Sequence, residues 1–323
     1  MNLATNYLGL SLPSPFVVGA SPFCDDPEVA LRLQDAGASA IVMRSLFAEQ
    51  ITAARQIASA GQIGESTEFS DYADYQLSPD EYLRQIGHLK RMLSIPIIAS
   101  LNGHHTGSWI DFAAQLERAG ADAIEFNFYQ VVTDPSMAAD QVEMEMLDMV
   151  GNVSNSVRIP IAAKLSPFHA SIAQLAVALE LAGASGVVVF NRFYQPDVNI
   201  DDLDVQPLLR LSDPGELLLR LRWLAILSPL LRGSLSASGG IHTSAGVVKA
   251  LLTGAHTVQL VSVLLKHGPH VLVTLREGLA GWMREHGYSD LDQFRGKLNH
   301  QRCRDSAAYE RANYIRVLQS WKM

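Results

Sequence analysis

One short motif recurs along the chain and constrains its fold more than any other feature. The motif reads as the last turn of a helix, a glycine and a short apolar run. Copies begin at Leu33, Leu116 and Leu179, and a looser copy begins at Leu251. Glycine suits the end of a helix because it adopts the left-handed conformation of the cap. A helix that runs directly into a buried strand is half of a βα unit, and repeated βα units produce parallel strands.

Eight short apolar runs alternate with helix-like stretches. The predicted strands are Phe16–Ala20, Ala40–Met43, Ile95–Leu101, Ala123–Asn127, Ile159–Leu165, Gly186–Phe190, Ser234–Ser238 and His256–Val261. The predicted helices are Pro27–Ala36, Pro79–Leu93, Ser108–Ala119, Pro135–Ser156, Ile172–Ala182, Gly215–Leu231 and Thr243–Leu252. This alternation predicts an α/β fold, the (β/α)8 TIM barrel. A doubly wound open sheet is the alternative, and the lack of an early Gly-x-Gly-x-x-Gly loop favours the barrel.

Three segments stand apart from this alternation. We predict a barrel over residues 1–298 and a C-terminal helical extension over 299–323, in which Ala307–Trp321 forms a helix that closes the barrel or contacts a second copy. We expect a homodimer. Ala48–Gln76 shows no clear pattern and would follow the second strand, where a long loop serves as a lid or substrate wall. Leu217–Leu231 is the most apolar stretch, and we predict a buried helix there with Arg220 and Arg222 facing solvent.

Composition excludes several classes of protein. The net charge of −8, with no basic cluster, argues against a nucleic-acid partner. The hydrophobic fraction of 48% argues against a disordered chain. Cys24 and Cys303 lie far apart, which excludes a disulfide framework or a Cys-x-x-Cys metal site and suits a reducing cytoplasm. No apolar stretch reaches the roughly 20 residues that span a bilayer. We therefore predict a cytoplasmic protein without a metal or a membrane partner.

Polar or glycine positions follow every predicted strand. The carboxyl ends of barrel strands meet at one face, where the active sites of this fold lie. Polar groups are costly there unless something binds them, so the set predicts a ligand site. Its members are Ala20-Ser21, Arg44-Ser45, Asn102, Asn127, Lys164 with Ser166, Asn191-Arg192, Ser238-Gly239-Gly240 and Val261-Ser262.

Two of these positions indicate a particular chemistry. Ser238-Gly239-Gly240 opens a helix, and glycines there let a phosphate approach backbone N–H groups, with Val261-Ser262 opposite. Lys164 ends an apolar strand, which suits a positive charge beside a flavin ring or the nucleophile of a Schiff-base lyase. The neighbouring Asn102, Asn127 and Asn191 favour the flavin, because carboxamides match the donors and acceptors of a ring edge.

At these residues the chain resembles the dihydroorotate dehydrogenase family, particularly its soluble class 1 branch. The resemblance runs from Leu8 to Leu298, and its closest motifs are Gly120–Asn127, Ala163–Pro167, Ala237–Ile241 and Gly254–Leu260. It implies FMN as the cofactor. The residues that would contact the ring or ribityl chain are Ala20, Ser21, Asn102, Asn127 and Lys164, and those that would hold the phosphate are Gly239, Gly240, Val261 and Ser262. Arg44, Ser45 and Asn191 complete the predicted cofactor site.

The sequence departs from the family where the substrate would bind. The family places a Cys or Ser base three residues after the strand-four Asn, and this chain has Gln130, whose amide accepts no proton. Val132 and Arg44 replace a second Asn and a Lys of the family pattern. Besides Lys164, the predicted catalytic residues are Tyr129, Ser166 and His104. A phenol has a reference pKa near 10 and would need activation, whereas His titrates near neutral pH.

The resemblance implies an FMN-dependent oxidoreductase of the CH–CH class. Its reaction would take a proton from C5 and a hydride from C6 of a small dihydropyrimidine, dihydroorotate in the family, and fumarate or another soluble acceptor would reoxidise the flavin. Three alternatives remain. One is a flavoprotein with a different, anionic substrate or partner, favoured by Arg44 and Arg192. Another is a flavin-free lyase using Lys164, and the third is a non-catalytic scaffold.

Overall fold

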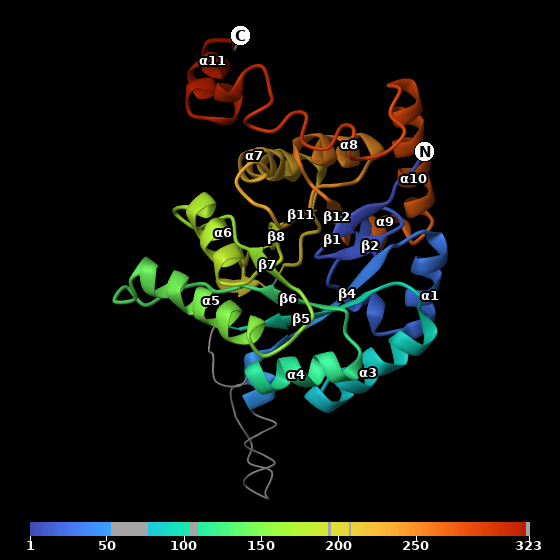
Figure 1. Ribbon diagram of the computed structural model, residues 1–323. Helices are drawn as coiled ribbons and strands as arrows, with labels where there is room; N and C mark the ends of the chain where they lie inside the picture. Colours follow the sequence, from blue (N-terminus) through green and yellow to red (C-terminus); the bar gives the residue numbers. More distant parts are fainter. Residues whose placement is uncertain (53–76, 104–108, 193–194, 207, 321–323) are drawn as a thin grey trace, which may run out of the picture.

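Eight parallel strands close into a barrel in the computed structural model, which describes residues 1–52, 77–103, 109–192, 195–206 and 208–320. Around the barrel the order is β11-β12-β3-β4-β5-β6-β7-β8 (Figure 1). The strands are β3 Phe16–Val18, β4 Ala40–Phe47, β5 Ile97–Asn102, β6 Ala123–Asn127, β7 Ile161–Leu165, β8 Gly186–Val189, β11 Ser234–Ser238 and β12 Thr257–Leu260. All eight coincide with predicted strands, and the (β/α)8 prediction is confirmed. An open sheet is excluded because β12 pairs with β3.

Helices surround the barrel, as Figure 1 shows. They are α1 Pro27–Ala36, α3 Pro79–Met92, α4 Trp109–Ala119, α5 Ala139–Ser154, α6 Ile172–Leu181, α7 Leu217–Leu227, α8 Ser244–Thr253, α9 Ser262–His267 and α10 Val271–Glu285. Local chemistry sets several ends. Ser78 and Glu81 form a capping box at the start of α3, and Gly37 and Gly254 adopt left-handed caps with φ of 109° and 119°. Helices α9 and α10 were not predicted from the sequence.

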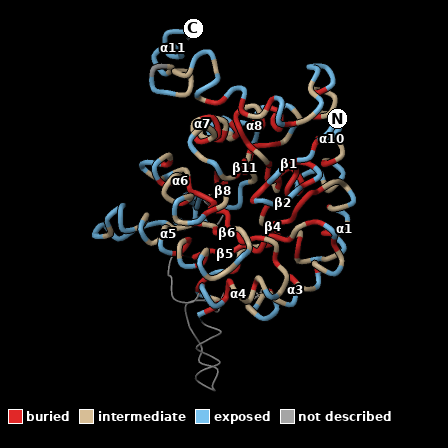
Figure 2. The backbone as a smooth tube through the Cα atoms, in the orientation of Figure 1, coloured by how far each residue is buried: buried red, intermediate tan, exposed pale blue. Residues whose placement is uncertain are grey.

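Two hydrophobic clusters hold the barrel together, and Figure 2 shows the buried segments gathered at its centre. The larger cluster lies between the strands and the helices. The smaller fills the lower interior, where Val17, Ala40 and Ala162 meet Tyr7 and Leu12 of an N-terminal hairpin. That hairpin, β1 Thr5–Tyr7 and β2 Leu10–Leu12, closes the end of the barrel opposite the predicted site. It was not predicted.

The apolar segment at α7 is a buried helix as predicted, but one of its arginines was misplaced. Arg222 is exposed, as expected. Arg220 is buried instead: its Nε donates to the Ser238 carbonyl at 2.9 Å and its Nη1 to the Glu216 carbonyl at 2.9 Å. The prediction was wrong because a guanidinium can be buried when its donors find acceptors.

The C-terminal segment continues beyond the barrel helices as η4 Ser306–Tyr309 and α11 Ala312–Ser320. Both overlap the helix predicted over Ala307–Trp321, and η4 begins one residue before it. Figures 1 and 2 show α11 apart from the barrel, with an exposed backbone. Its apolar side chains Tyr314, Ile315 and Leu318 are exposed. Among the described helices, none combines the length and apolar character needed to cross a bilayer.

Candidate active site

Three predicted residues lie side by side at the carboxyl ends of adjacent strands. In the strand register Asn102 of β5 pairs with Asn127 of β6, and Asn127 pairs with Lys164 of β7. Neighbouring parallel strands in register point their side chains to the same face, so these three share one layer of the barrel. Two carboxamides and an ammonium therefore meet where the sequence predicted a ligand.

Lys164 is held in a buried polar network. Its Nζ lies 3.2 Å from Glu125 Oε1 and 3.0 Å from Gln259 Oε1, and Gln259 Nε2 donates to Glu125 Oε2 at 2.5 Å. Glu125 is fully buried, so the pair has to be formed for either charge to be tolerated. The ammonium has one N–H left for a third acceptor. A Schiff-base nucleophile has to be a neutral amine, so the ion pair does not favour a lyase.

Two carboxamides at this face have buried atoms that meet no partner among the described residues. Asn127 Nδ2 donates to Ser45 Oγ at 3.4 Å, while its Oδ1 has no partner. Asn191 is buried, and its Nδ2 is likewise unsatisfied. Buried polar groups in proteins are nearly always hydrogen-bonded. An acceptor and a donor left over beside Lys164 fit the edge of a heterocycle such as a flavin.

Arg44 lies in an irregular part of β4. The pairing of β4 with β5 shifts register between Val42 and Ser45, and such bulges re-aim side chains next to active sites. The Arg44 guanidinium forms an ion pair with Asp25, and its backbone N–H donates to Cys24 Sγ at 3.3 Å. Burial raises the pKa of the Cys24 thiol. Arg44 thus stands beside the predicted Ala20-Ser21 segment with its charge neutralised.

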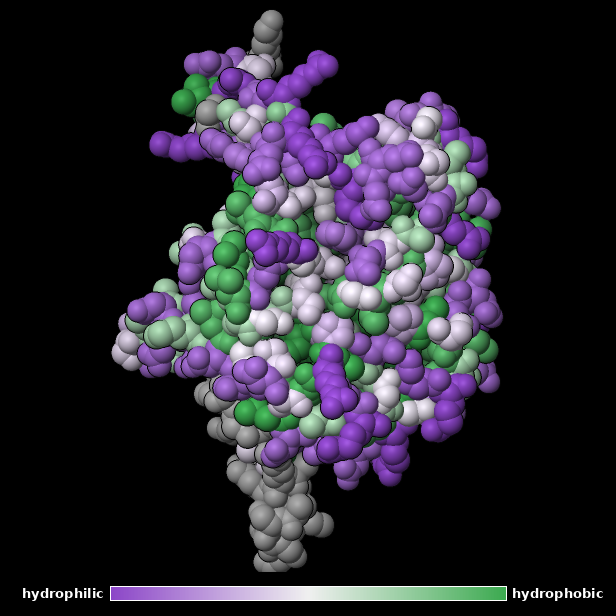
Figure 3. Space-filling model, in the orientation of Figure 1, coloured by the Kyte–Doolittle hydropathy of each residue, from purple (hydrophilic) through white to green (hydrophobic). Residues whose placement is uncertain are grey.

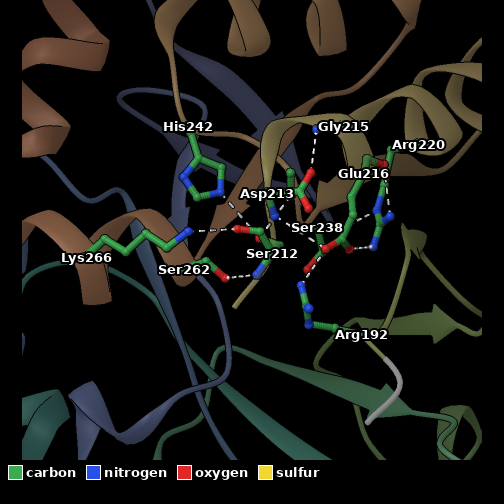
Figure 4. A network of polar contacts seen from close by, with 11 residues as sticks. Arg192, Ser212, Asp213, Gly215, Glu216, Arg220, Ser238, His242, Ser262 and Lys266 are labelled. Carbon is green, nitrogen blue, oxygen red and sulfur yellow. Dashed lines mark hydrogen bonds and ion pairs between the residues drawn. The ribbon is translucent and has the colours of Figure 1, made fainter. Parts of the chain in front are cut away.

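The predicted phosphate loop has the positive φ angles that its glycines favour, but one of its backbone N–H groups bonds to a protein side chain, that of Ser212. Gly239 and Gly240 have φ of 91° and 78°, which favours glycine. The Gly240 N–H donates to Ser212 Oγ at 3.2 Å. The Ser212 N–H donates to Ser262 Oγ at 3.0 Å (Figure 4). A Cβ on Gly240 would lie 2.4 Å from the Leu217 nitrogen. The start of α7 therefore requires this glycine even without a phosphate.

Two basic side chains reach the same loop, and no role was predicted for either from the sequence. Lys266 Nζ donates to the Ser212 carbonyl at 3.2 Å, and His242 Nε2 lies 3.5 Å from Ser212 Oγ (Figure 4). Burial and the nearby Lys266 lower the pKa of His242. Ser212, backbone N–H groups and the Lys266 ammonium are suitable partners for a phosphate, and His242 adds a neutral imidazole. Both residues could have been found from the sequence, since His242 directly follows Gly240-Ile241 and Lys266 lies in the helix that begins at Ser262.

In the rest of the same network two guanidiniums share one carboxylate. Arg192 Nη1 lies 2.6 Å from Glu216 Oε1, and Arg220 Nη2 lies 3.5 Å from Glu216 Oε2 (Figure 4). Arg44 and Arg192, which favoured an anionic substrate in the sequence analysis, are thus each engaged by a carboxylate.

A cavity of about 640 Å³ opens beside these strand ends. It is lined by Tyr129, Gln130 and Ser166, so the structure brings together the position of the missing base and two of its predicted replacements. Ser166 Oγ accepts from the Phe168 N–H at 3.0 Å. Glu145 and His169, which the sequence analysis did not single out, also line it. His104 and most of Ala48–Gln76 lie outside the described residues.

Comparison with known proteins places the chain among pyrimidine-related dehydrogenases. It is 30% identical over 215 residues to dihydroorotate dehydrogenase B (NAD(+)), catalytic subunit, of Pyrococcus abyssi, covering 64% of this chain and 70% of that protein. It is 24% identical over 325 residues to the chloroplastic dihydropyrimidine dehydrogenase (NADP(+)) of Arabidopsis thaliana, covering 91% and 76%. It is 23% identical over 322 residues to the NAD-dependent dihydropyrimidine dehydrogenase subunit PreA of Escherichia coli K12, covering 92% and 77%. No protein-family model matches the chain.

The barrel, with its lysine and carboxamides at the carboxyl ends of the strands, defines an enzyme of the (β/α)8 class. The relatives identify its family. The chain belongs to the dihydroorotate dehydrogenase family.

Proposed function

We propose that this protein is an FMN-dependent oxidoreductase that acts on the CH–CH bond of a dihydropyrimidine-type ring. One observation carries the proposal: Asn102, Asn127 and Lys164 align in register on β5, β6 and β7, beside unsatisfied amide atoms. The names of the relatives support the reaction class, since they are dehydrogenases of dihydroorotate and of dihydropyrimidines.

The residues divide into two groups in this proposal. Lys164, Asn102, Asn127 and Asn191 would hold the flavin ring, together with Ala20, Ser21, Arg44 and Ser45. Gly239, Gly240, Val261 and Ser262 would hold its phosphate. FMN, when bound, supplies the hydride acceptor. Lys164 would offer its remaining N–H to the ring, and the Glu125 pair keeps that ammonium fixed. Tyr129 and Ser166 line the substrate cavity and are the candidates for moving the proton at the position of Gln130.

Assembly and setting form the second part of the proposal. We infer a cytoplasmic homodimer of barrels spanning residues 1–298, with residues 299–323 as a helical extension. The free Cys24 and Cys303 suit a reducing compartment. The exposed apolar side of α11 supports a contact between copies. A soluble compound, fumarate or another, is the proposed acceptor.

The visible absorption spectrum of the freshly purified protein tests the proposal directly. We expect a flavin spectrum that bleaches when dihydroorotate or dihydrouracil is added without oxygen. Fumarate and NAD⁺ are then added separately to identify the acceptor. Lys164→Met should bind flavin at least tenfold more weakly, whereas Lys249→Met on the outer face of α8 serves as the control. A protein that shows no flavin, even after incubation with FMN, would contradict the proposal.

A further inference from the structure

The cavity beside the barrel mouth is large and mainly apolar. Its volume of about 640 Å³ lies within the range of small-molecule sites and exceeds the needs of one six-membered ring. Its walls come from the segment after β6, from α5 and from the segment after β7, and they include Phe128, Met146 and Met149. A ligand in it would bury an apolar body against these side chains.

The charge of the lining argues against an anionic ligand. Among the described residues that line the cavity there is no Lys or Arg, while Glu143 and Glu145 are both present. Arg44 and Arg192 do not line it, and each is paired with a carboxylate. A ligand carboxylate would enter partly desolvated and face two like charges, which is costly in a low-dielectric site.

Two polar atoms in the wall await a partner. Glu145 Oε2 and His169 Nε2 are shielded from solvent and meet no hydrogen-bond partner among the described residues. A buried polar atom without a partner lowers stability until something bonds to it. Burial lowers the pKa of His169, so the imidazole is neutral near pH 7 and adds no positive charge. The carboxylate of Glu145 can only accept hydrogen bonds.

We infer that this cavity is the substrate pocket and that it selects a ring compound carrying an uncharged or cationic donor group over one carrying a carboxylate, with Glu145 and His169 as the recognising side chains. The inference rests on the proposed function, because the cavity shares Gln130 and Ser166 with that site. The substrates named for the two kinds of relatives differ in this charge, since orotate is an anion and simple pyrimidines are neutral.

Three ligands that differ at one position test this selection. They are uracil bearing at C6 a carboxylate (orotate), a carboxamide, or an aminomethyl group that is an ammonium at neutral pH. Binding to the purified full-length protein is measured by calorimetry, which needs no flavin signal. We expect the carboxamide and aminomethyl compounds to bind at least tenfold more tightly than orotate. Equal or tighter binding of orotate, or no binding of any of the three, overturns the inference.

Variants show whether the named side chains are responsible. Glu145→Gln should weaken the aminomethyl compound at least tenfold and improve orotate, and His169→Leu should weaken the carboxamide. Asp148→Asn removes the same charge from an exposed position on α5 and should change none of the three. An unchanged preference in a folded Glu145→Gln protein overturns the assignment. Failure to bind flavin would contradict the proposed function alone, because the preference among ligands is measured independently of it.

Discussion

Lys266 offers a direct test of how a phosphate would be recognised. Its ammonium reaches the Ser212 carbonyl beside the Gly240 loop, so it would add a charge-assisted contact to a bound phosphate. Lys266→Gln should weaken FMN binding about tenfold, which corresponds to about 1.4 kcal/mol, and leave riboflavin binding unchanged. Fluorescence titration of both flavins measures the ratio. Lys249→Gln is the matched control, and an equal loss for both flavins would contradict a phosphate-specific role.

His256 predicts how stability depends on pH. Burial and the charge of Arg295 lower its pKa from 6.5 to about 4, and its Nδ1 accepts from the Leu235 N–H at 3.0 Å. The unfolded chain binds this proton below pH 6.5 and the folded chain below about 4. The free energy of unfolding therefore falls by about 3 kcal/mol as the pH drops through that window, then levels off.

His256→Gln keeps an acceptor and removes the titration. Urea unfolding between pH 7 and pH 4 should show a loss smaller by about 3 kcal/mol than in the parent protein. His88→Gln, at an exposed position on α3, should reproduce the parent curve. Parallel curves for the parent and His256→Gln would show that the buried imidazole does not govern this dependence.

At single residues, the sequence predicted which side chains lie at the strand ends better than it predicted their hydrogen-bond partners. The polar positions after the strands could be predicted because a strand end is a local property. The burial of Arg220 could not be predicted, since one of its acceptors, the Ser238 carbonyl, lies on β11, 18 residues further along the chain. Glu145 and His169 were missed for a similar reason: only the folded cavity brings a helix and a strand end together.

Among the elements, the N-terminal hairpin gives the sharpest prediction. Its two-residue turn, Leu8-Gly9, has φ of 56° and 82°, as in a type I′ turn. Gly9→Ala meets no atom within 4 Å, so it should cost about 1 kcal/mol from backbone strain alone. Gly87→Ala, inside α3 with ordinary contacts, should instead stabilise by about 0.5–1 kcal/mol. Chemical unfolding measures both changes in the free energy of unfolding. A Gly9→Ala protein as stable as the parent would contradict the predicted backbone strain.

This hairpin also shows why some elements escaped prediction. Type I′ turns usually carry Asn-Gly or Asp-Gly, and Leu-Gly gives no such signal. Burial explains the exception, because Leu8 is only 4% exposed in the barrel interior. Helices α1, α3 and α8, by contrast, were predicted to within one residue. Pro, Ser or Thr marks their starts locally, and Gly follows the ends of α1 and α8.

For the whole molecule, counting the βα repeat was enough to predict the closed barrel, because eight parallel strands have few ways to cover both faces. Which apolar side chains stay exposed on the surface was harder to predict from the sequence. Figure 3 shows hydrophobic side chains reaching the surface near α6 and α7, where Leu181, Leu218 and Leu230 are exposed. A hydrophobic residue in a helix pattern looks the same whether it faces its own core or a second copy.

Removing residues 304–323 tests the proposed dimer. The last backbone bond from this segment to the barrel helices is donated by His300 to the Ala225 carbonyl, so the truncated chain keeps it. The truncated protein should bind FMN normally and unfold within a few degrees of the parent, because α11 packs little against the barrel.

Light scattering should show a dimer for the parent and a shift toward monomer for the truncation. Ile315→Glu on the full chain, which charges the exposed apolar side of α11, should cause the same shift. A truncated protein that remains dimeric would show that the copies contact each other through another surface. A monomeric parent would contradict the proposed dimer itself.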